Sequence, residues 1–247
     1  MDAIKILVVG AGGTGGNIVT NLCRLLEPIK DKTISIIVAD GDIIEKKNRE
    51  RQPYSFEEEG LNKADTLVYK CSQVFDVKIS SYPHYIEDVN ALQMLLPGTL
   101  SYHNSAYIPI LVGAVDNNKT RAVFHNFFNQ SGNLFYIDSG NETWDGQVIC
   151  GVRADFKTIA SPAAEIYPDI LKSKEVFKSQ KGCADIVVEK PQQFITNLQA
   201  AIITLSYISD IVITGDLKTH QSTFDIKTKA MRSYDAPWAE NLKKVAV

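Results

Sequence analysis

The sequence predicts an α/β protein in which a doubly wound, mainly parallel sheet is followed by a C-terminal helix and a closing strand. Apolar segments of strand length alternate with segments of helical period from residue 4 to about residue 152, and this alternation is typical of parallel sheets with crossover helices. The first apolar segment, Ile4 to Val9, runs directly into a glycine-rich turn. A strand, a glycine turn and a helix in this order are typical of a Rossmann-like nucleotide site.

Length and composition limit the class of protein. The 247 residues, 45% of them hydrophobic, suffice for one sizeable domain. We divide it into a nucleotide-binding core (1–153), an irregular crossover loop (154–190) and a C-terminal helix, strand and tail (191–247). The net charge of −3 shows no overall excess of positive charge, so composition does not indicate binding to nucleic acid. Without a leader before the first strand or an apolar run near 18 residues, we expect a cytoplasmic protein that spans no membrane.

The glycine turn is the first candidate site. Gly10 permits the tight turn, Gly12 lets the backbone approach a phosphate, and Gly15 lets the helix pack against the strand. The helical pattern opens at Thr14, so its first free N–H groups and the positive end of its dipole face the anion. The glycines that we assign to the nucleotide are Gly10, Gly12, Gly13 and Gly15.

The second strand, Thr33 to Ala39, ends in Asp40-Gly41-Asp42. An acidic residue at the tip of this strand is placed to accept hydrogen bonds from ribose hydroxyls. The alternative is a solvated turn, since Asp-Gly is a common turn pair. We favour the ribose role for Asp40, because it closes a unit that began with the glycines.

A strongly charged stretch, residues 44–62, follows and contains Asn48, Arg51 and Gln52. Composition alone allows an exposed loop. A phosphate site, however, needs cations beyond the helix dipole, and Arg51 and Lys63 are close in sequence to the second strand. Lys63 also begins a helix-like segment to Phe75, on which Cys71 has the spacing of a core residue.

The remaining segments continue the alternation. Asp116 follows an apolar strand, so it lies at a carboxyl end, where ligands of parallel sheets bind. Residues 154–182 have no sustained period and read as a functional loop or lid. The apolar stripe of the last helix indicates core packing or a subunit interface. The segments are strands at 77–86, 110–115, 134–138, 147–152 and 222–226, helices at 87–96, 119–129 and 192–213, and a polar tail over the last twenty residues.

Five motifs occur in one order along the chain. They are GAGGTG at 10–15, DGD at 40–42, N-x-x-R-Q at 48–52, the lysine of GLNKA at 63, and DN-x-x-x-R at 116–121. Together they resemble the adenylation domain of the ThiF/MoeB family, which is related to ubiquitin-activating enzymes. DSGNETWDGQV at 138–148 is also similar to a family segment. The short amino terminus and residues 183–199 look most like the ThiF-related protein of the bacterial ParB-related, ThiF-related cassette (PRTRC).

The resemblance implies ATP and Mg²⁺ as cofactors, and a small β-grasp protein, ubiquitin-like or a sulfur carrier, as partner. The C-terminal carboxylate of that protein would attack the α-phosphate of ATP, giving an acyl adenylate and pyrophosphate, before an optional transfer to a thiol. The enzyme would act by positioning and by neutralising charge. A homodimer is also implied. The residues assigned by analogy are Asp40 at the ribose, Asn48, Arg51 and Lys63 at the triphosphate, and Asp116 at Mg²⁺. Asp42 and Gln52 are assigned to the nucleotide without a finer role.

The sequence departs from the family pattern in two places. No C-x-x-C pair exists, so we predict no zinc site. Only three residues precede the first strand, so the arginine that many members carry there must come from elsewhere, such as Arg49 or a partner protein.

Two residues keep two interpretations each. Cys183 lies near the position where some relatives carry a thioester or persulfide cysteine, and Lys181 could lower its pKa; the alternative is an inert thiol. Arg121 either pairs with Asp116 or a neighbour to support the site, or is a helix-surface charge. The other three cysteines fall in helix and strand patterns and are expected to be buried; they are Cys23, Cys71 and Cys150.

Two other functions compete with adenylation. The same fold could serve an NAD-dependent oxidoreductase, but a nicotinamide site does not call for a cluster of cations and a metal-binding carboxylate. A catalytically silent module that binds a nucleotide or a partner is the second alternative. The missing amino-terminal arginine favours it, and Arg51, Lys63 and Asp116 argue against it.

Overall fold

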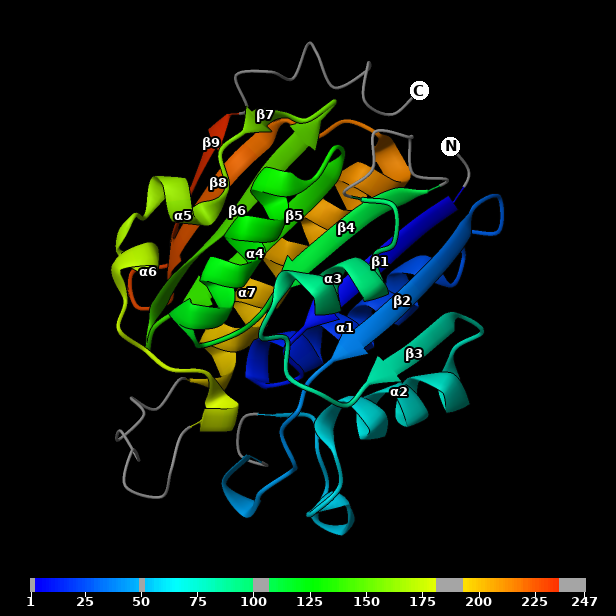
Figure 1. The fold of residues 1–247 in the computed structure, drawn as a ribbon. Coiled ribbons are helices and arrows are strands. Elements are labelled where there is room, and N and C mark those ends of the chain that lie inside the picture. Colours follow the sequence, from blue (N-terminus) through cyan, green and yellow to red (C-terminus); the bar gives the residue numbers. More distant parts are fainter. Residues whose placement is uncertain (1–2, 49–51, 100–106, 181–192, 236–247) are drawn as a thin grey trace.

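The computed structural model describes residues 3–48, 52–99, 107–180 and 193–235. The strands of these residues form one sheet in the order β3-β2-β1-β4-β5-β6-β8-β9, with β7 paired to β6 (Figure 1). Strands β3 to β5 of this order are parallel, and the pairings from β5 onward are antiparallel. The strands are β1 (Ala3–Val9), β2 (Thr33–Ala39), β3 (Lys78–Tyr82), β4 (Ile108–Gly113), β5 (Leu134–Asn141), β6 (Asp145–Ala154), β7 (Lys157–Ala160), β8 (Thr219–Asp225) and β9 (Ala230–Asp235).

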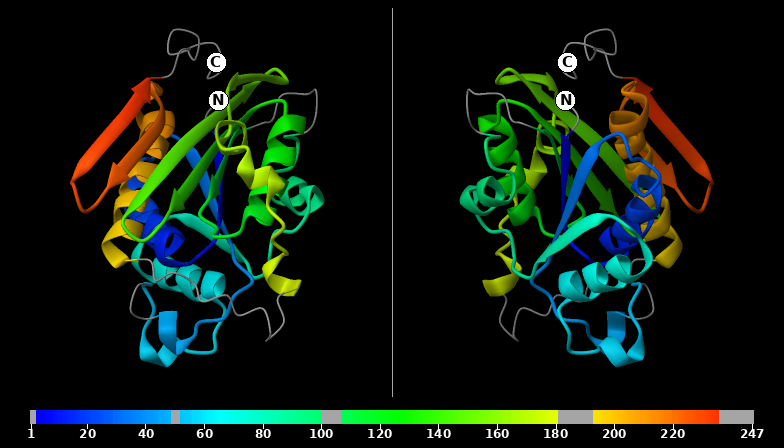
Figure 2. Two further views of the ribbon diagram at one scale, coloured as in Figure 1. Left: turned by 90° about the vertical axis from the view of Figure 1, so that its left-hand side faces the viewer. Right: turned by 90° about the vertical axis from the view of Figure 1, so that its right-hand side faces the viewer.

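Helices cover both faces of the sheet (Figure 2). One face carries α1 (Gly13–Leu26), α2 (Lys63–Val74) and α7 (Phe194–Ser209), which continues into a π-helical turn, Asp210–Thr214. The other carries α3 (Val89–Leu95) and α4 (Asn118–Gln130), with the short α5 (Ala163–Ile166) and α6 (Asp169–Lys172) beside α4. The predicted doubly wound α/β class is therefore confirmed.

The central strand explains why both faces need cover. Along β1, Ile6 and Val8 pack into the core beneath α1, while Leu7 and Val9 pack into the core beneath α4. Ile6, Leu7 and Val8 are fully buried, as expected of a central parallel strand with helices on both sides. Cys23, Cys71 and Cys150 are buried as predicted.

Two predicted loops contain regular structure. Residues 157–180 hold β7, α5, α6 and a 3₁₀ turn, Lys178–Gln180, where we expected an irregular segment. The expected polar tail includes β9, which pairs with β8. Both corrections have one cause, because short or fully exposed elements carry little apolar periodicity and are held by tertiary contacts.

The last helix is long and apolar enough, from Phe194 to Thr214, to cross a membrane by length and composition, contrary to the expectation that no such run exists. Half of that window is buried inside the protein, and an ordinary core helix meets the same criterion. Its inner face confirms core packing, since Ala200, Ala201 and Ile208 lie in the core under the sheet. The subunit interface remains a prediction.

Candidate active site

The glycine turn has the backbone geometry that its sequence predicts. Gly10 has a φ of +99°, and a Cβ there would lie 2.4 Å from the carbonyl oxygen of Ala114. A Cβ on Gly15 would lie 1.8 Å from the carbonyl oxygen of Gly10, so only glycine allows the helix to approach the strand. Gly12 is the N-cap of α1, which Gly13 begins, and no side chain caps it. This end of α1 therefore presents backbone N–H groups and a dipole suited to an anion.

Asp40 fixes the glycine turn to the end of β2. Its side chain accepts hydrogen bonds from the backbone N–H groups of Ala11 at 2.6 Å and Asp42 at 2.8 Å. The residue is buried, and burial, followed by the charge of Asp42, raises the pKa of its carboxyl group. One observed role of Asp40 is thus to anchor the turn, and the ribose contact stays a prediction.

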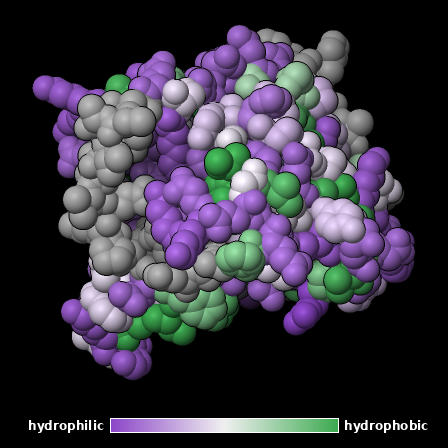
Figure 3. Space-filling view, turned by 90° about the horizontal axis from the view of Figure 1, so that it is seen from below, coloured by the Kyte–Doolittle hydropathy of each residue, from purple (hydrophilic) through white to green (hydrophobic). Residues whose placement is uncertain are grey.

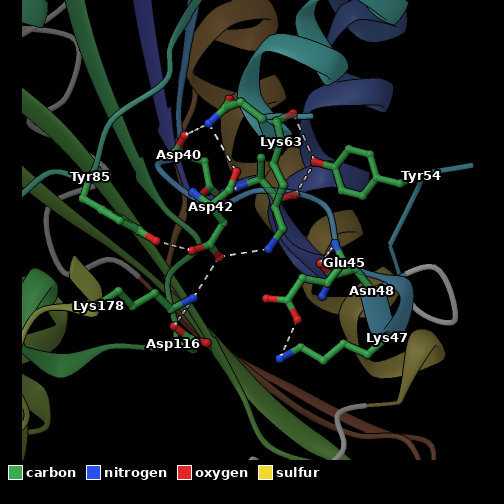
Figure 4. A network of polar contacts seen from close by, with 12 residues as sticks. Asp40, Asp42, Glu45, Lys47, Asn48, Tyr54, Lys63, Tyr85, Asp116 and Lys178 are labelled. Carbon is green, nitrogen blue, oxygen red and sulfur yellow. Dashed lines mark hydrogen bonds and ion pairs between the residues drawn. The ribbon is translucent and has the colours of Figure 1, made fainter. Parts of the chain in front are cut away.

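Asp42 is the centre of an ion-pair network (Figure 4). Its Oδ2 lies 2.9 Å from the Nζ of Lys63 and 3.3 Å from the Nζ of Lys178, while its Oδ1 accepts a hydrogen bond from the hydroxyl of Tyr85. Burial raises the pKa of the Asp42 carboxyl, but the charges of Lys178 and Lys63 outweigh burial and hold that pKa well below its usual range. Lys178 also lies 3.2 Å from Oδ1 of Asp116, which joins the ends of β2 and β4.

The segment between β2 and α2 brings further predicted residues to the network. Lys63 is 5% exposed, at the start of α2, and its helix is capped by the side chain of Asn62. Asn48 is buried and its Oδ1 accepts a hydrogen bond from the N–H of Glu45. The Oε1 of Gln52 is buried without a hydrogen-bond partner in the described part of the chain, and its amide is the nearest group to a Cβ placed on Gly12, at 3.9 Å. These residues line the edge that holds the glycine turn.

Three polar residues of the site were not predicted. The hydroxyl of Tyr54 donates to the carbonyl oxygen of Ala11 at 2.6 Å and lies 3.3 Å from that of Lys63, so it ties this segment to the glycine turn. Tyr85 and Lys178 contact Asp42, as described above. No spacing in the sequence links these residues to the turn, because each contact arises only when distant segments meet at one edge of the sheet.

Other candidates are placed differently or lie outside the described residues. Arg121 pairs with Asp138 at 3.3 Å, where the Asp138 side chain is buried and that of Arg121 is 14% exposed, so Arg121 has a partner other than Asp116 and the surface-charge alternative is wrong. Arg51 and Cys183 lie outside the described residues, as do Arg49 and Lys181. Their predicted roles remain predictions.

The donor set suits a magnesium ion only in company with phosphate. Among the described residues, no group of three or more histidine, cysteine or acidic side chains comes together as a metal site. Mg²⁺ is commonly held by one or two carboxylates together with waters and substrate phosphates. Asp116, whose side chain is 46% exposed, fits such a ligand, whereas Asp42 is already bonded to two lysines and a tyrosine.

One face of the protein lies at the carboxyl ends of the parallel strands (Figure 1). Seen from the carboxyl ends of the parallel strands, the described part of this face is largely hydrophilic with smaller apolar areas (Figure 3).

The family is shown by comparison with known proteins, because the model of the ThiF family matches residues 1–241. The chain belongs to the ThiF family. No curated protein matches it in sequence.

Solved structures of similar fold include PaaA and Escherichia coli MccB. PaaA has a TM-score of 0.66 at 16% identity over 94% of this chain and 64% of its own. MccB with ATP has a TM-score of 0.64 at 16% identity, over 94% of this chain and 63% of its own. MccB with AMPCPP and MccA has a TM-score of 0.62 at 16% identity, over 94% and 64%. The fold is shared, and this ThiF-family chain spans less than two thirds of the length of these proteins.

Proposed function

We propose that this ThiF-family chain is an adenylating enzyme, which uses ATP to activate a carboxylate of a protein or peptide as an acyl adenylate, with release of pyrophosphate. The observation that carries the proposal is the network beside the glycine turn in which Lys63 pairs with Asp42 and Lys178 bridges Asp42 and Asp116. Family membership supports it. So does the likeness in fold to MccB, which has been solved with ATP.

The charges of the network argue for a triphosphate over a nicotinamide dinucleotide. A dinucleotide needs the glycine turn and an acidic residue for the ribose, and Asp40 alone could serve as that residue. Binding of a dinucleotide does not require a buried lysine at the start of α2, and it does not require the bridge that Lys178 makes between Asp42 and Asp116. Phosphoryl and nucleotidyl transfer need fixed cations around the phosphates and a carboxylate to hold a metal. Lys63 and Asp116 meet these two needs.

The residues would act mainly by position. The glycine turn and the first N–H groups of α1 would hold phosphate, Lys63 would neutralise charge that develops at the α-phosphate, and Asp116 would hold Mg²⁺, which shields the phosphate charge when bound. Asp40 and Asp42 would set the ribose end, and Asn48, Arg51 and Gln52 would contact the triphosphate. Little covalent chemistry is required of the protein in this step.

The partner that we propose is a small protein of the β-grasp type, ubiquitin-like or a sulfur carrier, whose C-terminal carboxylate is adenylated. Structures of MccB with MccA support a protein or peptide as substrate. We also propose that the protein is a cytoplasmic homodimer. In a following step, the thiol of Cys183 would attack the acyl adenylate, forming a thioester and releasing AMP. The cassette relative named above, the PRTRC protein, is the narrower assignment that we favour.

Pyrophosphate release tests the proposal directly. The purified chain is mixed with ATP, Mg²⁺ and candidate β-grasp proteins, each paired with a version whose C-terminal carboxylate is amidated. We expect pyrophosphate with an intact partner and none with its amidated form, because only a free carboxylate can attack the α-phosphate. ATP binding without pyrophosphate from any candidate would instead favour the catalytically silent module.

A further inference from the structure

Lys178 is the one lysine of the described chain that is ion-paired to carboxylates from two different strand ends. Its Nζ lies 3.3 Å from Asp42 Oδ2 and 3.2 Å from Asp116 Oδ1. Burial lowers the pKa of its ammonium group, but the charges of Asp116 and Asp42 outweigh burial and raise it. The ammonium therefore holds its charge at the position that bridges the two carboxylates.

The position of Lys178 is built by the segment that carries it. Residues 173–180 lie across the amino end of α4, where the side chain of Asn117 donates to the carbonyl oxygen of Val176 at 2.8 Å. The N–H of Asn118 donates to the carboxylate of Glu175 at 2.6 Å. On the other side of Lys178, the hydroxyl of Ser179 bonds the carboxylate of Glu87. This segment is thus seated beside the site on both sides of the lysine.

The charge balance shows why this lysine matters for an anionic ligand. In the described part of the network, Glu45 and Lys47 pair with one another at 2.9 Å. Among the described residues, Lys63 and Lys178 make the ion pairs of Asp42 and Asp116, and the charge of Lys63 also acts on the buried Asp40. A triphosphate adds several negative charges, so its binding next to three carboxylates requires that the available cations turn toward it. A lysine ammonium on its flexible stem can make that move.

We propose that Lys178 is a further phosphate-binding residue of the proposed adenylation site. It holds Asp42 and Asp116 together in the absence of nucleotide, and it turns from these carboxylates to the phosphates when ATP binds with Mg²⁺. The segment 173–180 then changes its contacts with α4 as the site fills. Asp116 would hold the divalent cation when it is bound, so Lys178 and the cation would compete for the Asp116 carboxylate. The inference rests on the proposed function, since it assigns a residue to the same nucleotide.

Three variants test the proposal by calorimetry: Lys178→Gln, Lys178→Arg and, as control, Lys172→Gln, whose exposed side chain pairs only with Asp169 among the described residues. Loss of a charged phosphate contact should weaken binding of ATP·Mg²⁺ about 10- to 100-fold in Lys178→Gln. Lys178→Arg should restore most of that affinity. Without nucleotide, Mn²⁺ as a probe should bind Lys178→Gln more tightly than the wild type. Lys172→Gln should match the wild type in both titrations.

Hydrogen exchange on the wild-type protein gives a readout that does not depend on a variant. Addition of ATP·Mg²⁺ should change protection in the peptides that cover 173–180. Unchanged ATP affinity in Lys178→Gln, or unchanged exchange in this segment, would overturn the role of Lys178 while ATP binding by the wild type leaves the proposed function standing. A wild-type protein that binds no ATP would overturn both.

Discussion

Asp42 and Asp138 lie at the same edge of the sheet, and each is paired with a cation. The two networks differ in how far their side chains are exposed to solvent. Asp138 is 3% exposed at its side chain and lies 3.3 Å from Arg121, and it accepts a hydrogen bond from the hydroxyl of Tyr136. Burial and the charge of Asp138 raise the pKa of that tyrosine far above its ordinary value. Tyr136 and Asp138 are buried, and the Arg121 side chain is 14% exposed.

The network around Asp42 is open by comparison. Asp42 is 20% exposed at its side chain, Lys178 30% and Asp116 46%, and two lysines share the one carboxylate of Asp42. A closed network holds strands and helices together, whereas an open network with shared partners can exchange one of them for a ligand. The two networks should therefore respond to mutation in different measurements.

Removal of the cation from the closed network should give the largest effect, and it should appear in stability. Arg121→Met leaves Asp138 buried without its cation, and breaking a buried pair in this way typically costs about 3–5 kcal/mol. Urea unfolding should show this loss in the free energy of unfolding, and the protein that remains folded should still bind ATP. A loss below about 1 kcal/mol would place Arg121 outside the structural network.

Replacement of the buried Lys63 in the open network should first lower the rate of the reaction. Lys63→Met is expected to lower the rate of pyrophosphate release about 10²- to 10³-fold, equivalent to about 3 kcal/mol, because a preorganised charge at the phosphate is lost. The control is Lys30→Met, because the exposed Lys30 pairs with Asp76 and not with Asp42. Equal rates in the two variants would remove Lys63 from the reacting centre.

Neutralisation of Asp116 should give the smallest effect. Its side chain is half exposed, so Asp116→Asn should leave the free energy of unfolding within about 0.5 kcal/mol of the wild type. The dependence of ATP affinity on Mg²⁺ should nevertheless fall, since a carboxylate ligand is lost. A metal dependence equal to that of the wild type would assign the ion to other residues.

The same contrast explains what the sequence could reveal. Gly10 and Gly15 were predictable because no other residue allows the positive φ or the close helix approach that they provide. Asp40, Asp42 and Asp116 were predictable as residues that follow apolar strands. Their roles toward a nucleotide still depend on the resemblance of the motifs.

The partners of these residues could not be predicted in the same way. Arg121 is close in sequence to Asp116 but pairs with Asp138, because the register of β4 and β5 brings Asp138 opposite Gly113, beneath α4. Lys178 comes from a segment without a helical or strand pattern of apolar residues. Its position beside Asp42 depends on the contacts of residues 175–179 with the start of α4 and with Glu87. The exposed edge strand β9 was missed because it buries no face.

Calorimetric titration of the purified protein with ATP·Mg²⁺, and separately with NADH, tests the central claim most directly. We predict that ATP·Mg²⁺ binds and that NADH does not bind. Binding of NADH without binding of ATP would contradict the account, because the glycine turn and Asp40 would then serve a dehydrogenase.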